Sequence, residues 1–183
     1  SLGASTDYFQ GNSTLPALDP VHRASFTISL TLFNQVELPF TAYITNRSGA
    51  GYSQPFSQFG VSPKIGDWLQ LHAGYFNKNY SEFTLGDVRL LGGGADITSK
   101  QFQVSALYGY SLLARAPDSS QNFGGTYARR ILGGRAGFTS DKSIFAVTIV
   151  HAQDEETSII PTASTHLPYE NFLTSLSYSG SII

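Results

Sequence analysis

The sequence predicts an all-β protein, an antiparallel up-and-down transmembrane β-barrel of about ten strands, either a barrel of its own or part of a larger one. Only 13% of its residues are charged, about half of the roughly 25% found in ordinary soluble domains. Apolar and small polar residues alternate along most of the chain, and no apolar run approaches the ~18 residues that a spanning helix needs. Short and long connections also follow one another in strict alternation, as they do in membrane barrels.

The composition limits the classes of protein that the chain can belong to. Its 183 residues suit one domain over 1–183 with a core of its own. The absence of cysteine excludes disulfides, thiolate metal sites and a cysteine nucleophile. The net charge of −2 and the pI near 6.0 argue against nucleic acid as a partner. The chain begins Ser-Leu-Gly-Ala-Ser without a methionine, which we interpret as a processed N-terminus or an excerpt.

The first half of the chain is expected to contain five strands. Phe26, Ile28 and Leu30 fall on one face of the clearest of them, with serine and threonine on the other. Hydroxyl side chains without charge suit a narrow hydrated interior better than a surface that meets bulk water. The least regular segment has Phe56 and Phe59 three residues apart, so it is interpreted as a bulged strand or an infolded segment. In order, the five expected strands are 2–9, 24–33, 37–46, 53–61 and 67–77.

The second half is expected to contain five more strands. Two of them pair as a hairpin across the short turn 98–99, and the last carries Phe172, Leu176 and Tyr178 on one face. No amphipathic helix of useful length is expected between them. In order, these strands are 87–97, 100–113, 126–138, 143–151 and 169–178.

The connections support a barrel only when 53–61 is counted as a strand. Short turns at 34–36, 62–66, 98–99 and 140–141 then alternate without exception with longer loops. Two belts of aromatic side chains are expected at the ends of the strands, one at each membrane interface. Near the short turns these are Phe33, Trp68, Phe102, Phe138 and Phe145, and near the long loops they are Tyr75, Tyr108, Tyr110, Tyr127 and Tyr169. A water-soluble β-sandwich remains the alternative fold.

Three arginines lie on one expected strand. Arg129 and Arg135 share a face and are expected to line the lumen with His72, because an arginine facing lipid at mid-membrane costs roughly 2–4 kcal/mol. Arg130 points to the other face and is expected near an interface. The arginines either form an anion-selective or substrate-guiding interior or pair internally with one of three acidic residues, Asp67, Asp87 or Asp96.

No catalytic, metal or cofactor site is expected from the motifs. The Gly92-Gly93-Gly94 run lacks the helix start and the Lys-Ser/Thr pair of a phosphate loop, so it is expected to let the barrel bend or to let a plug pack closely. The four histidines are widely spaced, which disfavours zinc. Asp154-Glu155-Glu156 could bind Ca²⁺, but a solvated acidic loop is the commoner meaning. Serine and histidine are present, as in outer-membrane lipases, but serine is too abundant here for this to predict an enzyme.

The stretch from Gln54 onward resembles large outer-membrane β-barrel proteins of the Bacteroidota and Chlorobi lineage. The resemblance covers about half of the chain. It implies that the chain is the N-terminal part of a bigger barrel, and it implies no reaction and no substrate. The matching residues are Gln54-Pro55-Phe56, Gln58-Phe59-Gly60, Ser62-Pro63, Trp68, His72 and Gly74-Tyr75, with weaker matches at Leu107-Tyr108-Gly109 and Tyr169-Glu170-Asn171-Phe172.

These observations lead to three hypotheses about function. The first is a non-enzymatic outer-membrane barrel that acts as a pore or as a scaffold in a transport or secretion assembly. Its partners would be outer-membrane lipid and other subunits of that assembly. The second is a secreted all-β subunit of a surface filament or adhesive layer, whose edges neighbouring chains complete. The third is a lipid-modifying barrel enzyme.

Overall fold

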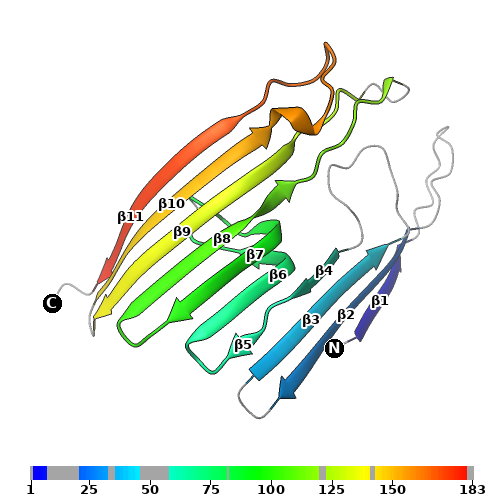
Figure 1. Cartoon of the computed structure of the whole chain (residues 1–183). Coiled ribbons are helices and arrows are strands. Elements are labelled where there is room, and N and C mark those ends of the chain that lie inside the picture. The colour runs from blue at the N-terminus through cyan, green and yellow to red at the C-terminus, as the bar shows by residue number, and fades with distance from the viewer. Residues whose placement is uncertain are drawn as a thin grey trace.

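A computed structural model confirms an all-β chain built on one antiparallel sheet (Figure 1). The structure describes residues 2–7, 21–32, 36–45, 58–81, 83–119, 123–140 and 143–180. No helix in these ranges is long and apolar enough to cross a membrane.

The strands lie side by side in the order of the sequence, so each pairs with its neighbour along the chain. Within the described ranges, β1 and β11 form the two edges of the sheet and each has one partner strand. A 3-10 turn, η2 (Glu156–Ser158), follows β10. The strands are β1 (Leu2–Asp7), β2 (Val21–Leu32), β3 (Val36–Thr45), β4 (Gln58–Val61), β5 (Lys64–Ile65), β6 (Leu69–Lys78), β7 (Val88–Thr98), β8 (Phe102–Leu112), β9 (Ala128–Ser140), β10 (Ser143–Glu155) and β11 (Glu170–Gly180).

The irregular segment of the sequence is a broken strand. β4 and β5 together occupy one position between β3 and β6, and Ser62 and Pro63 interrupt them. Proline lacks the N–H that a ladder needs, which explains the break. Residues 58–61 of the expected strand 53–61 are in β4, and 53–57 lie outside the described ranges. With β4 and β5 counted as one strand, short and long connections alternate as expected.

Several strand ends differ from the expectation. The sequence predicted that the acidic run Asp154-Glu155-Glu156 lies in a loop. Instead β10 continues to Glu155, so only Glu156 lies beyond the strand. The extension forms because Asp154 and Glu155 still pair with Arg129 and Ala128 of β9. Residues 153–155 do not alternate between apolar and polar side chains, so the sequence pattern did not predict a strand there. Pairing with β9 sets the end of β10 instead.

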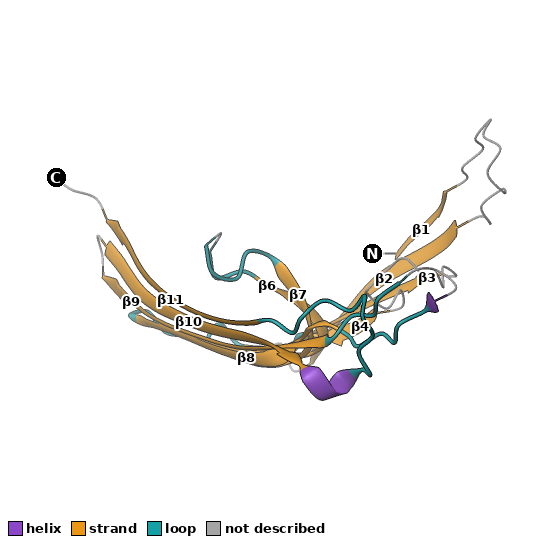
Figure 2. Cartoon of the chain, turned by 90° about the horizontal axis from the view of Figure 1, so that it is seen from above, coloured by secondary structure: helices purple, strands orange, loops and turns teal. Residues whose placement is uncertain are grey.

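The sheet is a curved trough with two chemically different faces (Figure 2). Residues that pair across strands share a face, so the register carries each face across the sheet. One row runs Ala95, Ala106, Gly134 and Ile149 across β7 to β10, and it lies on the convex face. Of the 24 exposed large hydrophobic side chains, 18 lie on this face; the other six are in turns or loops or, for Ile144, on the concave face.

A row of glycines crosses the concave face of the sheet. Gly60, Gly74, Gly92 and Gly109 are successive partners across β4, β6, β7 and β8. A Cβ at Gly92 would lie 2.1 Å from the carbonyl oxygen of Tyr108, so no other residue fits without moving backbone. Of the two roles expected for the Gly92-Gly93-Gly94 run, bending and close packing, the close backbone approach at Gly92 fits the second. Its neighbour Gly93 faces the convex side, where a Cβ would meet only ordinary contact at 3.4 Å.

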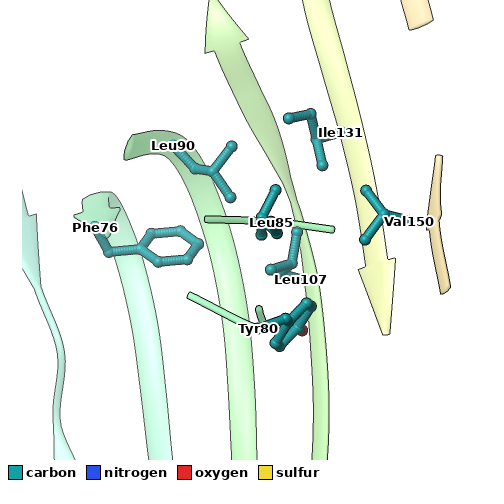
Figure 3. Packing of buried hydrophobic residues seen from close by; sticks show 7 residues of the cluster. All are labelled: Phe76, Tyr80, Leu85, Leu90, Leu107, Ile131 and Val150. Carbon is teal, nitrogen blue, oxygen red and sulfur yellow. The ribbon is translucent and has the colours of Figure 1, made fainter. Parts of the chain in front are cut away.

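The connection between β6 and β7 folds back into the hollow of the sheet (Figure 2). Tyr80 and Leu85 of this connection are buried against five side chains of the concave face (Figure 3). An isolated bridge between Ser81 and Leu85 closes the turn of the connection. The cluster consists of Phe76, Tyr80, Leu85, Leu90, Leu107, Ile131 and Val150. The sequence predicted only a loop over 78–86, so this infolded connection is a new feature of the fold.

Candidate functional site on the concave face

A chain of polar contacts starts where β4 and β5 are interrupted. The Ser62 hydroxyl lies 2.9 Å from His72 Nδ1, and His72 Nε2 lies 2.8 Å from Asp96 Oδ2. Lys78 binds the other oxygen of Asp96. His72 reaches Asp96 because it lies diagonally across from it on the same face of β6 and β7, where Asp96 pairs with Gln70. Lys78 is eight residues from Gln70 along β6, so it reaches Asp96 because the end of β6 folds back over the concave face.

The infolded connection continues this network across the sheet. The Tyr80 hydroxyl lies 2.8 Å from the Ser105 hydroxyl of β8, and Arg135 of β9 donates to the backbone carbonyl of Tyr80. Burial raises the pKa of the Tyr80 phenol, which is a neutral hydrogen-bonding group already at its ordinary pKa. The Lys78 ammonium lies 5.4 Å from the centre of the Tyr80 ring. Hydrogen bonds to β8 and β9 therefore hold the connection inside the trough.

Two polar hollows flank the network. One has a volume of about 330 Å³ and is lined by Gln70, Lys78, Asp96, Gln103, Ser105 and Arg135, among others. The second, of about 320 Å³, is lined by Thr41, Ser62, Gln70, His72 and Asn77, among others. Both open from the concave face, so a solute inside the trough would meet hydroxyl, amide and charged groups rather than hydrocarbon.

The three expected lumen residues all project from the concave face, but they do not form one site. His72 and Arg135 belong to the network described above. Arg129 lies near the long-loop end of β9, where its Nε and Nη2 bind the two oxygens of buried Asp154 at 2.7 and 3.0 Å. The arginine partners expected from the sequence, Asp67, Asp87 and Asp96, were wrong for Arg129. Its true partner sits in a stretch predicted to be a loop.

The expected interfacial aromatics fall into two groups. Tyr108 and Tyr110 project from the convex face toward the long-loop end, and Trp68 is 55% exposed in the turn before β6. Tyr75 instead lines the hollow beside Thr41 and His72, and its hydroxyl is buried. Tyr127 was placed wrongly, because it precedes β9 and is only 8% exposed. It packs beside a hollow formed by the connections around it, together with Leu112 and Leu167.

Comparison of the chain with protein-family models, with curated proteins and with solved structures finds no match. Its own geometry must therefore carry the functional argument.

Sequence reasoning missed most of the concave network. Ser62 and Lys78 gave no motif, and Tyr80 lay in a segment without regular alternation. The one usable signal was parity, since His72 and Lys78 are six residues apart on one strand and must share a face. Among the residues that the structure describes, no group of three or more His, Asp or Glu side chains could hold a metal ion.

Proposed function

We propose that the chain is a wall of an outer-membrane β-barrel, a non-enzymatic pore or a scaffold in a transport or secretion assembly. The observation that carries the proposal is the convex face. Its described charged side chains, Arg130, Glu155 and Glu170, all lie at the strand ends next to the long loops. Arg89 belongs to the end of β7 that folds into the trough, where it lines a hollow with Thr41 and His72. Apart from His151 and Gln153 near the same ends, the rest of the convex face is apolar or small, as a surface in contact with lipid would be.

The size of this apolar face favours a membrane over water. Eighteen large side chains at about half exposure, with roughly 150–250 Å² each, present on the order of 1,500 Å². Soluble monomers rarely expose an apolar patch beyond about 300–600 Å². At about 25 cal/mol per Å², moving this area from water into hydrocarbon would stabilise the protein by about 40 kcal/mol.

The height of the apolar face also suits a bilayer. From Phe102 to Tyr110 the convex face of β8 is apolar or aromatic at every second position. That stretch spans about 26 Å along the strand, or about 20 Å along the membrane normal at a tilt of about 40°. The hydrocarbon-facing band of outer-membrane barrels is about 25 Å tall.

The concave face supports a hydrated and narrowed interior. Ser and Thr line it on β2, and the infolded connection stands within it, tied down by Arg135. In the proposed barrel, Arg129, Arg135 and His72 line the lumen. The free edges of β1 and β11 pair with further strands, either of the same barrel or of another subunit.

Extraction and gel migration test the proposal. The protein should sediment with membranes, need detergent for extraction, and migrate faster in SDS before heating than after it. A monodisperse protein that needs no detergent would instead support the alternative, a secreted subunit of a surface filament or adhesive layer. In that case neighbouring copies would cover the convex face and the free edges.

One observation favours a second candidate function, a barrel enzyme that cleaves lipid esters. Ser62, His72 and Asp96 are hydrogen-bonded in the order nucleophile, base and orienting acid. Nε2–H would donate to Asp96, so that Nδ1 accepts the proton of Ser62 as its oxygen attacks an ester carbonyl. The leaving alcohol would take that proton, and water would release the acyl group. A fluorophosphonate probe should then label the protein but not Ser62→Ala; absence of labelling removes this candidate.

A further inference from the structure

The convex face carries a groove near its long-loop end, over β9, β10 and β11. Its volume is about 680 Å³, within the roughly 300–1,000 Å³ of small-ligand sites. Gly134 leaves the floor of the groove open, and Leu132, Ile149 and Phe172 form its apolar walls. The concave hollows are polar, whereas this groove is chiefly apolar.

An acid–base pair closes one end of the groove. His151 Nε2 lies 2.8 Å from Glu170 Oε1, and the Glu170 side chain remains 62% exposed. Glu170 belongs to a cross-strand row in which Gln153 of β10 pairs with Arg130 of β9 on one side and with Glu170 of β11 on the other. Arg130 donates to the Gln153 side chain at 2.7 Å. One row therefore presents a cation at one side and a carboxylate two strands away.

The row of Arg130, Gln153 and Glu170 must lie in polar surroundings if the convex face contacts a membrane. A charge that faces hydrocarbon is costly, so Arg130 and Glu170 would sit where lipid headgroups begin. Strands are about 4.8 Å apart, which puts the backbones of these two residues about 10 Å from each other. Their side chains can close on a small headgroup that carries one negative and one positive group.

We propose that the groove binds a phosphatidylethanolamine, with one acyl chain lying over Gly134. Its phosphate pairs with Arg130, whose guanidinium suits phosphate oxygens. Its primary ammonium donates to Glu170 beside His151. Charge complementarity selects this headgroup, because a lipid without the ammonium supplies no cation to Glu170 at the membrane boundary, where His151 contacts only one of its carboxylate oxygens. The inference rests on the proposed function, since it requires the convex face to contact lipid.

Filling the groove tests where the acyl chain lies. A Cβ at Gly134 would meet only one atom, at 3.8 Å, so Gly134→Leu should fold and block the floor. Gly93→Leu is the matched control, because Gly93 also lies on the convex face but outside the groove, with its nearest contact at 3.4 Å. In native mass spectrometry from detergent, the unmodified protein and Gly93→Leu should retain one phosphatidylethanolamine. Gly134→Leu should lose about tenfold in affinity, or about 1.4 kcal/mol.

Competition between headgroups tests the charge argument. Phosphatidylethanolamine should outcompete phosphatidylglycerol with the same acyl chains, and Glu170→Gln should remove that preference. Arg130→Gln should weaken the binding of both lipids. Equal retention of the two lipids, or unchanged binding to Gly134→Leu, overturns the lipid site alone. Failure of the unmodified protein to float with liposomes overturns the proposed membrane function as well.

Discussion

Ala106 lies at the centre of the convex face, on β8 between Ala95 of β7 and Gly134 of β9. It is four residues from Phe102 and from Tyr110, so it would sit near the middle of the proposed membrane band. An arginine at the lipid-facing midplane of a barrel costs about 2–4 kcal/mol. On a water-exposed surface the same change usually alters stability by no more than about 0.5 kcal/mol.

We therefore expect Ala106→Arg to lower the free energy of unfolding by about 3 kcal/mol in phospholipid vesicles. Two controls set the scale. Ser140→Arg, at the short-turn end of the convex face of β9, should cost only about 0–1 kcal/mol. Gln103→Arg, on the concave face of β8, should be close to neutral. Urea titrations of the three variants measure these differences. Equal costs at Ala106 and Gln103 would refute the assignment of the faces.

Two further predictions address the close approach at Gly92 and the interior. Gly92→Ala should destabilise the protein by about 3 kcal/mol in thermal or urea unfolding, because its Cβ would strike the backbone of β8. Gly93→Ala should cost less than about 1 kcal/mol, and similar losses in the two would contradict the proposed close approach. Arg135→Leu removes the donor that holds the infolded connection through Tyr80, so single-channel conductance in planar bilayers should rise. An unchanged conductance with unchanged stability would contradict this anchoring role.

The sequence predicted the regular strands well because their alternation is a local property. The face that holds Phe26, Ile28 and Leu30 follows directly from a period of two. The broken position of β4 and β5 was harder, since Ser62 and Pro63 interrupt the pattern and only the count of connections required a strand there. The length of β10 was missed because Asp154 is held by a cross-strand arginine rather than by alternation.

The concave network depended on contacts that the sequence does not display. The register of β6 and β7 brings Asp96 beside His72. Lys78 reaches Asp96 from the far end of β6, which pairs with Val88 rather than with Asp96. The inward fold of the β6–β7 connection depends on Tyr80 finding Ser105, which lies 25 residues further along the chain. Tyr127 was misplaced for a related reason, since its position near a strand end says nothing about the connections that bury it.

Fluorescence quenching at adjacent residues of β8 tests the central claim most directly. The chain contains no cysteine, so Val104→Cys and Gln103→Cys each introduce one labelling site on opposite faces of the strand. With a small fluorophore at each site, brominated phospholipids should quench the label at 104 and leave the label at 103 unquenched. Equal quenching at the two sites, or a label at 104 that only a water-soluble quencher reaches, would contradict a lipid-facing convex surface.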